Sequence, residues 1–430
     1  MEDAYPKQLA EFVQDQWIGI ENKTKDEDML PSLSILEQLL STTYQASLLH
    51  DEGRSVTFRL ILCKPDRFTS NEGPPTGLHC LEFTDSRPFT AHELKQLSQA
   101  ADYYRSLIGI KFGQNGKLRI WGIIHSGPRW LREVAGGRRA SVPLPPSLVI
   151  KIIGPGSLEV CKGSLLLAKL DQGYLIGKSL DVFNSLWLPA IFAPFREEYL
   201  TSHIAMREQT QKPRASLDPD LPRMIGQHMV RRMIAAIRDS NHGGTLILIS
   251  PERTVELCHT NRYINFKYTF LDGEPRRRWG TLIVKALNTL AEVYGSRGTD
   301  ITVGWKEYEK STNGTIVELD EAIFEFSYLI ARLAAVDGAV VLTKQFELLG
   351  FGTEIKLEQA HIPRVARALD LEGHQEEMES VENVGTRHRS AYRLFKEMPD
   401  ALAIVISQDK GVHFIKCRNG TVTYWNHGGA

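Results

Sequence analysis

The chain has 430 residues, of which 42% are hydrophobic and 24% charged, and its formal net charge is −1. This length is typical of two or three domains. The balance of residue types is that of a folded, soluble protein rather than a disordered one. A net charge so close to zero provides no bulk electrostatic attraction to nucleic acid, so nucleic acid is not an expected partner.

The five cysteines are far apart in the sequence and form no CxxC pair, which favours neither a zinc site nor a disulfide framework. We interpret them as free thiols in a reducing cytoplasm. The N-terminus, Met1-Glu2-Asp3, is acidic and lacks the apolar run of a signal peptide. No stretch approaches the 18 apolar residues of a membrane span. The expected location is therefore cytoplasmic, with no membrane partner.

The first half of the chain mixes helical and strand patterns, which predicts an α+β module. Thr90 is the expected cap of the second helix, because Glu93 follows it at the spacing of a capping box. The predicted helices are residues 33–49 and 91–107, and the predicted strands are residues 56–63, 118–124, 147–153 and 164–170.

Residues 207–222 have the composition of a linker. The segment REQTQKPRASLDPDLP is polar, contains three prolines and lacks apolar periodicity. We therefore predict an N-terminal domain at 1–206, a linker at 207–222 and a second domain at 223–430. The N-terminal domain contains no motif with evident chemistry, so we expect it to be a sensor or regulatory domain that binds a small-molecule regulator.

The second half alternates between helices and strands, and Asn419-Gly420 is expected to turn its last hairpin. The natural architecture is a mixed β-sheet flanked by helices, so the whole chain is expected to be of the mixed α/β class. The predicted helices are residues 224–237, 279–294, 319–335 and 387–398, and the predicted strands are residues 245–249, 340–342, 401–407, 412–417 and 421–425.

Asp337-Gly338-Ala339 stands where a predicted helix gives way to the apolar strand 340–342. A carboxylate at such a junction can hold Mg²⁺ or Mn²⁺, or accept a proton from an attacking hydroxyl. Gly338 and Ala339 have almost no side chain, so a flat base or a ribose could lie against their backbone.

A second motif, Gly385-Thr386-Arg387-His388-Arg389-Ser390-Ala391, opens the helix predicted at 387–398. Thr386 is the expected N-cap, and the remaining N–H groups of the first turn favour an anion there. Arg387 and Arg389 suit a phosphate, because a guanidinium grips phosphate oxygens in pairs. His388 could ligate a metal ion or donate to a phosphate oxygen.

Each motif alone has a simpler interpretation. Asp-Gly is a common turn dipeptide, and Arg-His-Arg is usually a solvated surface. The basic loop at 276–278 is likewise interpreted as a solvated surface rather than a nucleic-acid site. The two motifs together, each at a junction ahead of an apolar strand, favour a functional site.

At these residues the chain resembles the diadenylate cyclase (DAC) family, whose catalytic domain makes cyclic di-AMP from two ATP molecules. The resemblance extends from about Arg223 to the C-terminus. Residues 337–339 match the family's DGA motif, and residues 385–391 match its GTRHR-A motif. Ser407 and Gly411 match the two ends of the family's Ser-Glu-Glu-Thr-Gly segment.

The sequence departs from the family pattern at two places. Asp409 stands where the family has a glutamate, and residues 350–355 (GFGTEI) replace its base-lining Leu-Pro-Leu segment. The resemblance would place Gly352 and Ile355 at the nucleotide, with Ile355 against the adenine. Ser407 and Asp409 are expected beside the nucleotide as well.

The resemblance implies one ATP and a divalent metal, Mn²⁺ or Mg²⁺, in each domain, and a homo-oligomer in which two catalytic domains face each other. Each ribose 3′-hydroxyl would attack the other nucleotide's α-phosphate, releasing two pyrophosphates. Asp337 would act on the attacking hydroxyl and, with His388, on the metal. Thr386, Arg387 and Arg389 would hold phosphates.

Two other hypotheses stay open. One is a nucleotide-binding sensor that kept this fold and lost catalysis, which the two departures motivate. The other is an interaction scaffold, supported only by the arginine clusters.

Overall fold

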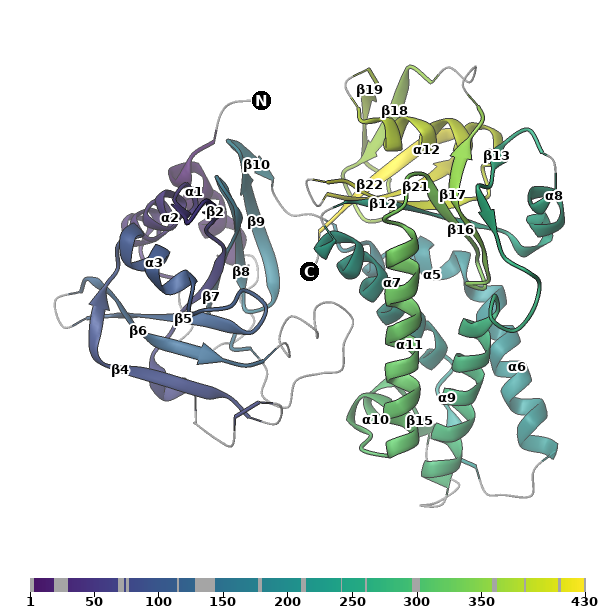
Figure 1. Ribbon diagram of the computed structural model, residues 1–430, viewed down its shortest axis with the longest axis horizontal. Coiled ribbons are helices and arrows are strands. Elements are labelled where there is room, and N and C mark those ends of the chain that lie inside the picture. The colour runs from purple at the N-terminus through teal and green to yellow at the C-terminus, as the bar shows by residue number, and fades with distance from the viewer. Residues whose placement is uncertain are drawn as a thin grey trace. The chain divides into compact units, whose positions relative to one another are not determined.

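The structure, a computed structural model, describes residues 4–18, 30–68, 73–74, 77–113, 116–127, 144–176, 180–209, 214–240, 242–259, 261–295, 302–357, 362–382, 384–408 and 411–428. The chain forms two compact units (Figure 1). The N-terminal unit is Met1–Ser179 with Gly429–Ala430, and the C-terminal unit is Leu180–Gly428.

The N-terminal unit is built on an eight-stranded sheet with the order β10-β9-β8-β7-β3-β5-β6-β4, in which only the β3–β5 pair is parallel. Three helices pack against one face through a shared apolar core. The strands are β3 (Phe58–Leu62), β4 (His79–Pro88), β5 (Ser106–Phe112), β6 (Leu118–His125), β7 (Leu148–Gly154), β8 (Ser157–Lys162), β9 (Leu165–Asp171) and β10 (Tyr174–Ile176). The helices are α1 (Pro6–Ile18), α2 (Leu33–Ser47) and α3 (Ala91–Ser98), and a small hairpin joins β1 (His50–Asp51) to β2 (Arg54–Ser55).

The helix predicted at 91–107 is too long. It begins as expected, with the Thr90 hydroxyl accepting a hydrogen bond from the Glu93 N–H at 3.3 Å. It ends at Ser98, and β5 starts at Ser106 because the apolar residues that follow are buried between β3 and β6. Tertiary pairing therefore overrides the local pattern at this point.

The C-terminal unit contains a ten-stranded mixed sheet with the order β13-β17-β16-β12-β20-β21-β22-β18-β19, and β14 adds a further pairing to β17. Its strands are β12 (Gly244–Ile249), β13 (Ile264–Asn265), β14 (Tyr268–Thr269), β16 (Ala339–Thr343), β17 (Leu348–Ile355), β18 (Arg364–Ala368), β19 (Glu376–Ser380), β20 (Leu402–Ile406), β21 (Val412–Arg418) and β22 (Thr421–His427). A two-stranded parallel pair joins β11 (Ser216–Leu217) to β15 (Thr302–Val303). This is the mixed sheet with flanking helices that the sequence predicts.

Helices cover both faces of this sheet, with α12 on one face and α7, α9 and α11 on the other (Figure 1). The helices are α5 (Trp187–Ile191), α6 (Ala193–Gln209), α7 (Leu221–Asp239), α8 (Thr254–Cys258), α9 (Arg278–Gly295), α10 (Trp305–Lys310), α11 (Gly314–Leu333) and α12 (Thr386–Glu397).

Strand β20 shows why a continuous apolar run is needed in the middle of the sheet. Leu402, Ile404 and Ile406 are buried on the side of α7, α9 and α11. Ala403 and Val405 are buried on the side of α12. Because both faces are covered, neither set of alternate residues can be polar.

The two units divide between Ser179 and Leu180, earlier than the linker expected at 207–222. Phe183 and Leu188, which precede that segment, and Ala215 and Leu221, which lie within it, are all buried in the core of the C-terminal unit. The segment 207–222 is therefore part of the C-terminal unit rather than its boundary.

The Asn419-Gly420 turn is confirmed. Both residues have positive φ, +49° and +79°, and Arg418 pairs with Thr421 across the hairpin. All five cysteines are free thiols. None of the helices in the described ranges has the length and apolar character that crossing a bilayer requires.

Candidate active site

Three strands bring the predicted site residues to one edge of the C-terminal sheet. Strand β12 runs parallel to β16, with Leu246 opposite Val340, and antiparallel to β20, with Gly244 opposite Ile406. The starts of β12 and β16 therefore lie beside the end of β20. Asp337 precedes β16 by two residues, and Ser407 directly follows β20.

Gly338 fixes the shape of the Asp337-Gly338-Ala339 turn. Its φ is +108°, and a Cβ built on it would lie 2.6 Å from the carbonyl carbon of Gly352 and 2.7 Å from the nitrogen of Thr353. The turn is thus pressed against the backbone of β17. As a result Ala339 is buried in the core, whereas Asp337 remains exposed to solvent.

Gly243 brings a second backbone segment to the same edge. Its φ is +65°, and a Cβ there would lie 2.5 Å from the carbonyl oxygen of Ile406. Arg387 Nη1 donates a hydrogen bond to the carbonyl oxygen of His242 at 2.8 Å, which joins the start of α12 to the segment before β12. A guanidinium has five N–H donors, so this bond leaves Arg387 further donors for a ligand.

Helix α12 begins one residue earlier than expected. Gly385 is the N-cap, and Thr386 is the first helical residue, so the predicted capping role of Thr386 is wrong. The helix has no side-chain cap, and its first intrahelical bond runs from the Arg389 N–H to the Gly385 carbonyl. The N–H groups of the first turn therefore point out of the helix, where the dipole favours an anion. Thr386 and Arg389 are exposed beside them.

His388 points inward rather than outward. Its side chain is buried, and its ring packs against the ring of His413 at a centroid distance of 4.7 Å and against Tyr392 at 6.3 Å. Burial raises the pKa of the Tyr392 hydroxyl.

The loop after β20 is closed by two hydrogen bonds to one carbonyl. The Ser407 N–H donates to the Gly411 carbonyl at 2.9 Å, and the Ser407 hydroxyl donates to the same oxygen at 3.2 Å. Asp409 lies outside the described residues.

Gly352 and Ile355, the two residues of the segment 350–355 expected at the nucleotide, lie on β17. Gly352 is buried, with φ +60°, and its backbone meets Gly338. Ile355 pairs with Ile264 and is partly buried against the α12 side of the core. The structure thus brings Gly352 to the DGA turn, whereas a contact of Ile355 with adenine stays a prediction.

Residues that could hold a metal are few. Within the described ranges no group of three or more His, Cys, Asp or Glu side chains is arranged to bind a metal ion. Mg²⁺ is commonly bound by one or two carboxylates together with substrate phosphates. An exposed Asp337 fits that mode, and shared ligation by His388 stays a prediction.

The basic loop at 276–278 does not form a free cationic patch. Each arginine has a carboxylate partner: Arg276 pairs with Glu347 at 2.9 Å, Arg277 with Asp272 at 2.6 Å, and Arg278 with Glu274 at 3.1 Å. These charges are used to hold the start of α9, which accounts for the cluster without nucleic acid.

Sequence reasoning missed Gly243 and His413. The signal for His413 was its place in the strand: Val412 and Phe414 face one core, so His413 and Ile415 face the side of α12. The signal for Gly243 is weaker, because a glycine between the helix predicted at 224–237 and the strand predicted at 245–249 is also typical of an ordinary helix end.

Two segments of the chain match known families. Residues 272–417 match the DAC family, described as "DisA bacterial checkpoint controller nucleotide-binding". Residues 25–125 match the family described as "Probable sensor domain DACNV". Neither the curated proteins nor the solved structures yield a match. The C-terminal unit therefore carries a DAC-type nucleotide-binding domain and the N-terminal unit a sensor domain of the DACNV type.

Proposed function

We propose that the C-terminal unit is a diadenylate cyclase, which condenses two ATP molecules into cyclic di-AMP and two pyrophosphates. The observation that supports this most is the convergence at one sheet edge. Asp337 and Ser407 lie there, and Arg387 ties the start of α12 to it, all within the segment that matches the DAC family.

The start of α12 is suited to a triphosphate. Its N–H groups and dipole favour an anion, and Thr386 and Arg389 are exposed beside them. Arg387 adds guanidinium donors at the same point, held in place by its bond to His242. In this proposal these groups hold and orient the phosphates, and His388 supports the first turn from within.

Asp337 is the proposed catalytic carboxylate. It is exposed at the start of β16 and held there by the close packing of Gly338, so it can accept the proton of the attacking 3′-hydroxyl. A divalent ion, Mn²⁺ or Mg²⁺, would supply charge neutralisation at the phosphates when bound, with Asp337 as its protein ligand.

The reaction needs two domains, because one domain of this kind holds one nucleotide. Each 3′-hydroxyl attacks the partner nucleotide's α-phosphorus, a new P–O bond forms, and pyrophosphate leaves. Two such steps close the ring. Catalysis then consists mainly of positioning and charge neutralisation. We accordingly propose a homo-oligomer that pairs catalytic domains.

We also propose that the N-terminal unit senses a small molecule. A row of buried charges, Arg59, Lys151 and Glu159, crosses neighbouring strands of its sheet. Lys151 pairs with Glu159 at 3.4 Å, and Arg59 donates to the Ser106 carbonyl at 3.3 Å. Burial lowers the pKa of Arg59 to about 10. Buried, shifted charges of this kind are frequent at functional sites.

Asp337→Asn tests the catalytic assignment. The substitution keeps the shape of the side chain and removes its charge. We therefore expect the affinity for ATP, measured without added metal, to stay the same. Turnover should fall by about a hundredfold or more. Binding is measured by calorimetry and turnover by release of pyrophosphate. Asp85→Asn, at an exposed position on β4, is the matched control and should leave both unchanged.

Turnover by Asp337→Asn at the parent rate would show that the assigned role is wrong. ATP binding by the parent chain without turnover in either metal would instead favour the silent nucleotide-binding sensor.

A further inference from the structure

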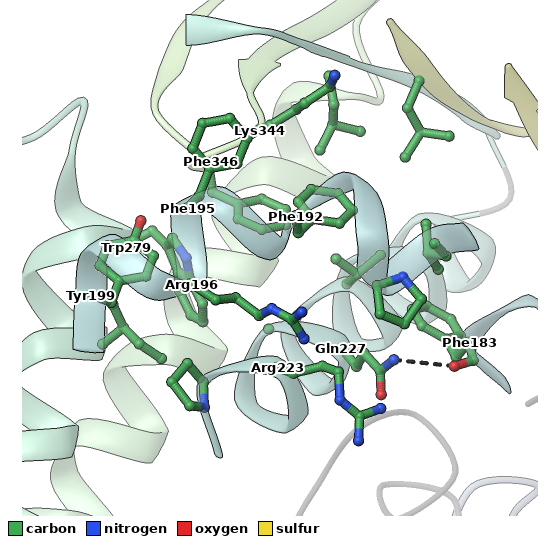
Figure 2. A pocket seen from close by; sticks show the side chains of 18 of the residues that line it. Phe183, Phe192, Phe195, Arg196, Tyr199, Arg223, Gln227, Trp279, Lys344 and Phe346 are labelled. Atoms are coloured by element: carbon green, nitrogen blue, oxygen red, sulfur yellow. Dashed lines mark hydrogen bonds between the residues drawn. The ribbon is translucent and has the colours of Figure 1, made fainter. Parts of the chain in front are cut away.

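A second pocket in the C-terminal unit has no place in the reaction proposed above. Figure 2 shows aromatic side chains lining it, among them Phe183 from the segment before α5, Phe195 from α6 and Trp279 from α9. It contains about 670 Å³ of empty space, including the part that is open to solvent. The walls that matter here are Phe192, Phe195, Trp279, Phe346 and Phe414. Pockets of this size and character typically receive small molecules.

The pocket lies at the opposite ends of the strands that carry the candidate active site. Leu248, near the end of β12, pairs with Leu402 at the start of β20, and both line the pocket. Lys344, which directly follows β16, lines it as well. Asp337 and Ser407 belong to the other ends of β16 and β20, so the two sites are separate.

The polar groups of the pocket are mainly cationic. Arg223 lines it but is occupied by Asp220, with two hydrogen bonds of 3.1 and 3.0 Å. Lys344 is also occupied, because its ammonium donates to the Ser250 hydroxyl at 3.2 Å.

Arg196 differs from these two cations. In the part of the chain that the structure describes, its guanidinium takes part in no hydrogen bond or ion pair, and it is directed into the pocket beside Gln227 (Figure 2). Burial lowers the pKa of Arg196, although Asp220 acts in the opposite direction. A partly desolvated guanidinium without an anion is stabilised by any ligand that supplies one.

We propose that this pocket binds a small amphiphilic anion, namely a carboxylate on an aliphatic or aromatic body, with the acid group on Arg196 and the body among the aromatic side chains. A cation would be repelled by Arg196. A polar nucleotide would find few partners for its base and sugar on walls that are almost entirely apolar.

The position of the pocket would allow a bound ligand to influence the candidate active site through the strands that the two sites share. Phe192, Phe195 and Arg196 belong to the segment at the start of the C-terminal unit. Leu248 and Leu402 belong to strands β12 and β20, whose opposite ends lie at the candidate active site. A ligand between them would tie this first segment to the sheet. The binding itself is independent of whether the active site turns over ATP.

Calorimetric titration of the full chain with three separate ligands, octanoate, octanol and octylamine, tests the proposal. The three ligands have the same carbon chain and differ in charge. Octanoate should bind about tenfold or more tightly than octanol, since the difference is a charge-assisted hydrogen bond. Octylamine should bind least. Arg196→Gln should reduce the affinity for octanoate to that for octanol. The control Arg364→Gln, at an exposed position on β18, should leave the affinity for all three ligands unchanged.

Gly226→Leu tests the location. Gly226 lines the pocket from α7, and a Cβ built on it meets no atom within 4 Å, so the larger side chain enters the pocket without disturbing the helix. Leucine is also a better helix former than glycine, so this variant should fold. The Gly226→Leu variant should bind neither octanoate nor octanol.

Equal affinity for octanoate and octanol, tighter binding of octylamine, no binding of any of the three, or unchanged binding by the Gly226→Leu variant would each overturn the proposal.

Discussion

Gly338 carries a strict local requirement in the candidate active site, because its backbone conformation and its neighbours both exclude a side chain. A positive φ of +108° is unfavourable for any residue with a Cβ, and the backbone of Gly352 and Thr353 fills the space where that atom would lie. This explains why the middle residue of the motif is glycine, and why its neighbours Asp337 and Ala339 face opposite environments.

Gly338→Ala is therefore expected to lower the free energy of unfolding by about 1–3 kcal/mol and to weaken ATP binding, because the turn must move away from β17. Urea unfolding and calorimetric titration with ATP measure the two effects. Gly154→Ala, at the end of β7, is the control: the φ of Gly154 is not positive, and a Cβ there meets nothing within 4 Å. Equal stability and ATP affinity in Gly338→Ala and the parent would contradict this account of the turn.

His427 introduces a dependence of stability on pH. It is almost completely buried, and its Nδ1 accepts a hydrogen bond from the Val182 N–H at 3.3 Å. Burial lowers the pKa of His427 well below the ordinary value for histidine. Asp181, 3.8 Å away, acts in the opposite direction, but it is itself paired with Arg231 at 2.9 Å.

The sign follows from proton binding. As pH falls below about 6.5 the unfolded chain protonates His427 and the folded chain does not, so the free energy of unfolding decreases, by up to about 1.4 kcal/mol per pH unit. Urea unfolding of the parent and of His427→Gln between pH 7.5 and 5.5 checks this. The parent should lose stability more steeply than the variant, and identical pH dependence would show that His427 does not contribute.

At the scale of elements, α11 is the helix that leads into the active-site turn, since it ends at Leu333 shortly before Asp337. Its N-cap is Asn313, whose side-chain oxygen accepts a hydrogen bond from the Ile316 N–H at 3.3 Å. The cap satisfies one of the N–H groups that the first turn leaves without an intrahelical partner.

Asn313→Ala should lower the free energy of unfolding by about 1 kcal/mol, because alanine supplies no acceptor. Asn313→Ser, which retains a capping oxygen, should stay close to the parent. Urea unfolding of the three proteins distinguishes them. If alanine and serine were equally stable at this position, the hydrogen bond to Ile316 would contribute nothing.

Sequence patterns predicted the helices and strands that carry a clear apolar pattern within their own residues. The run that became β20 is apolar on both faces, and α7, α9 and α11 each carry an apolar stripe. Strand β17 was missed because Gly350 and Gly352 weaken its strand pattern. Glycine is nevertheless required at both positions: a Cβ on Gly350 would lie 2.4 Å from the carbonyl oxygen of Tyr268, and Gly352 has a φ of +60°. Strands β18 and β19 were missed as well, since β19 is largely exposed.

The same distinction holds for the active site. Asp337, Thr386 and Arg389 could be predicted because each motif is contiguous in sequence. Gly243 and His413 enter the site only through the strand order β16-β12-β20-β21, which depends on pairings between residues far apart in the chain. No local pattern contains that information.

At the scale of the whole molecule, the chain combines a sensor domain of the DACNV type with a DAC-type nucleotide-binding domain. The segment from Leu180 to Gln209 belongs to the second unit rather than the first. It supplies much of the wall of the pocket around Arg196, so this connection is built into the unit that carries the candidate active site.

The most direct test of the central claim is to incubate the full chain with ATP and Mn²⁺ or Mg²⁺ over a dilution series and to identify the products by chromatography and mass spectrometry. The account predicts cyclic di-AMP with two pyrophosphates for each molecule formed. It also predicts a specific rate that falls as the protein is diluted, because two domains must meet. Intact ATP under every condition, or a specific rate that stays constant down to a proven monomer, would contradict it.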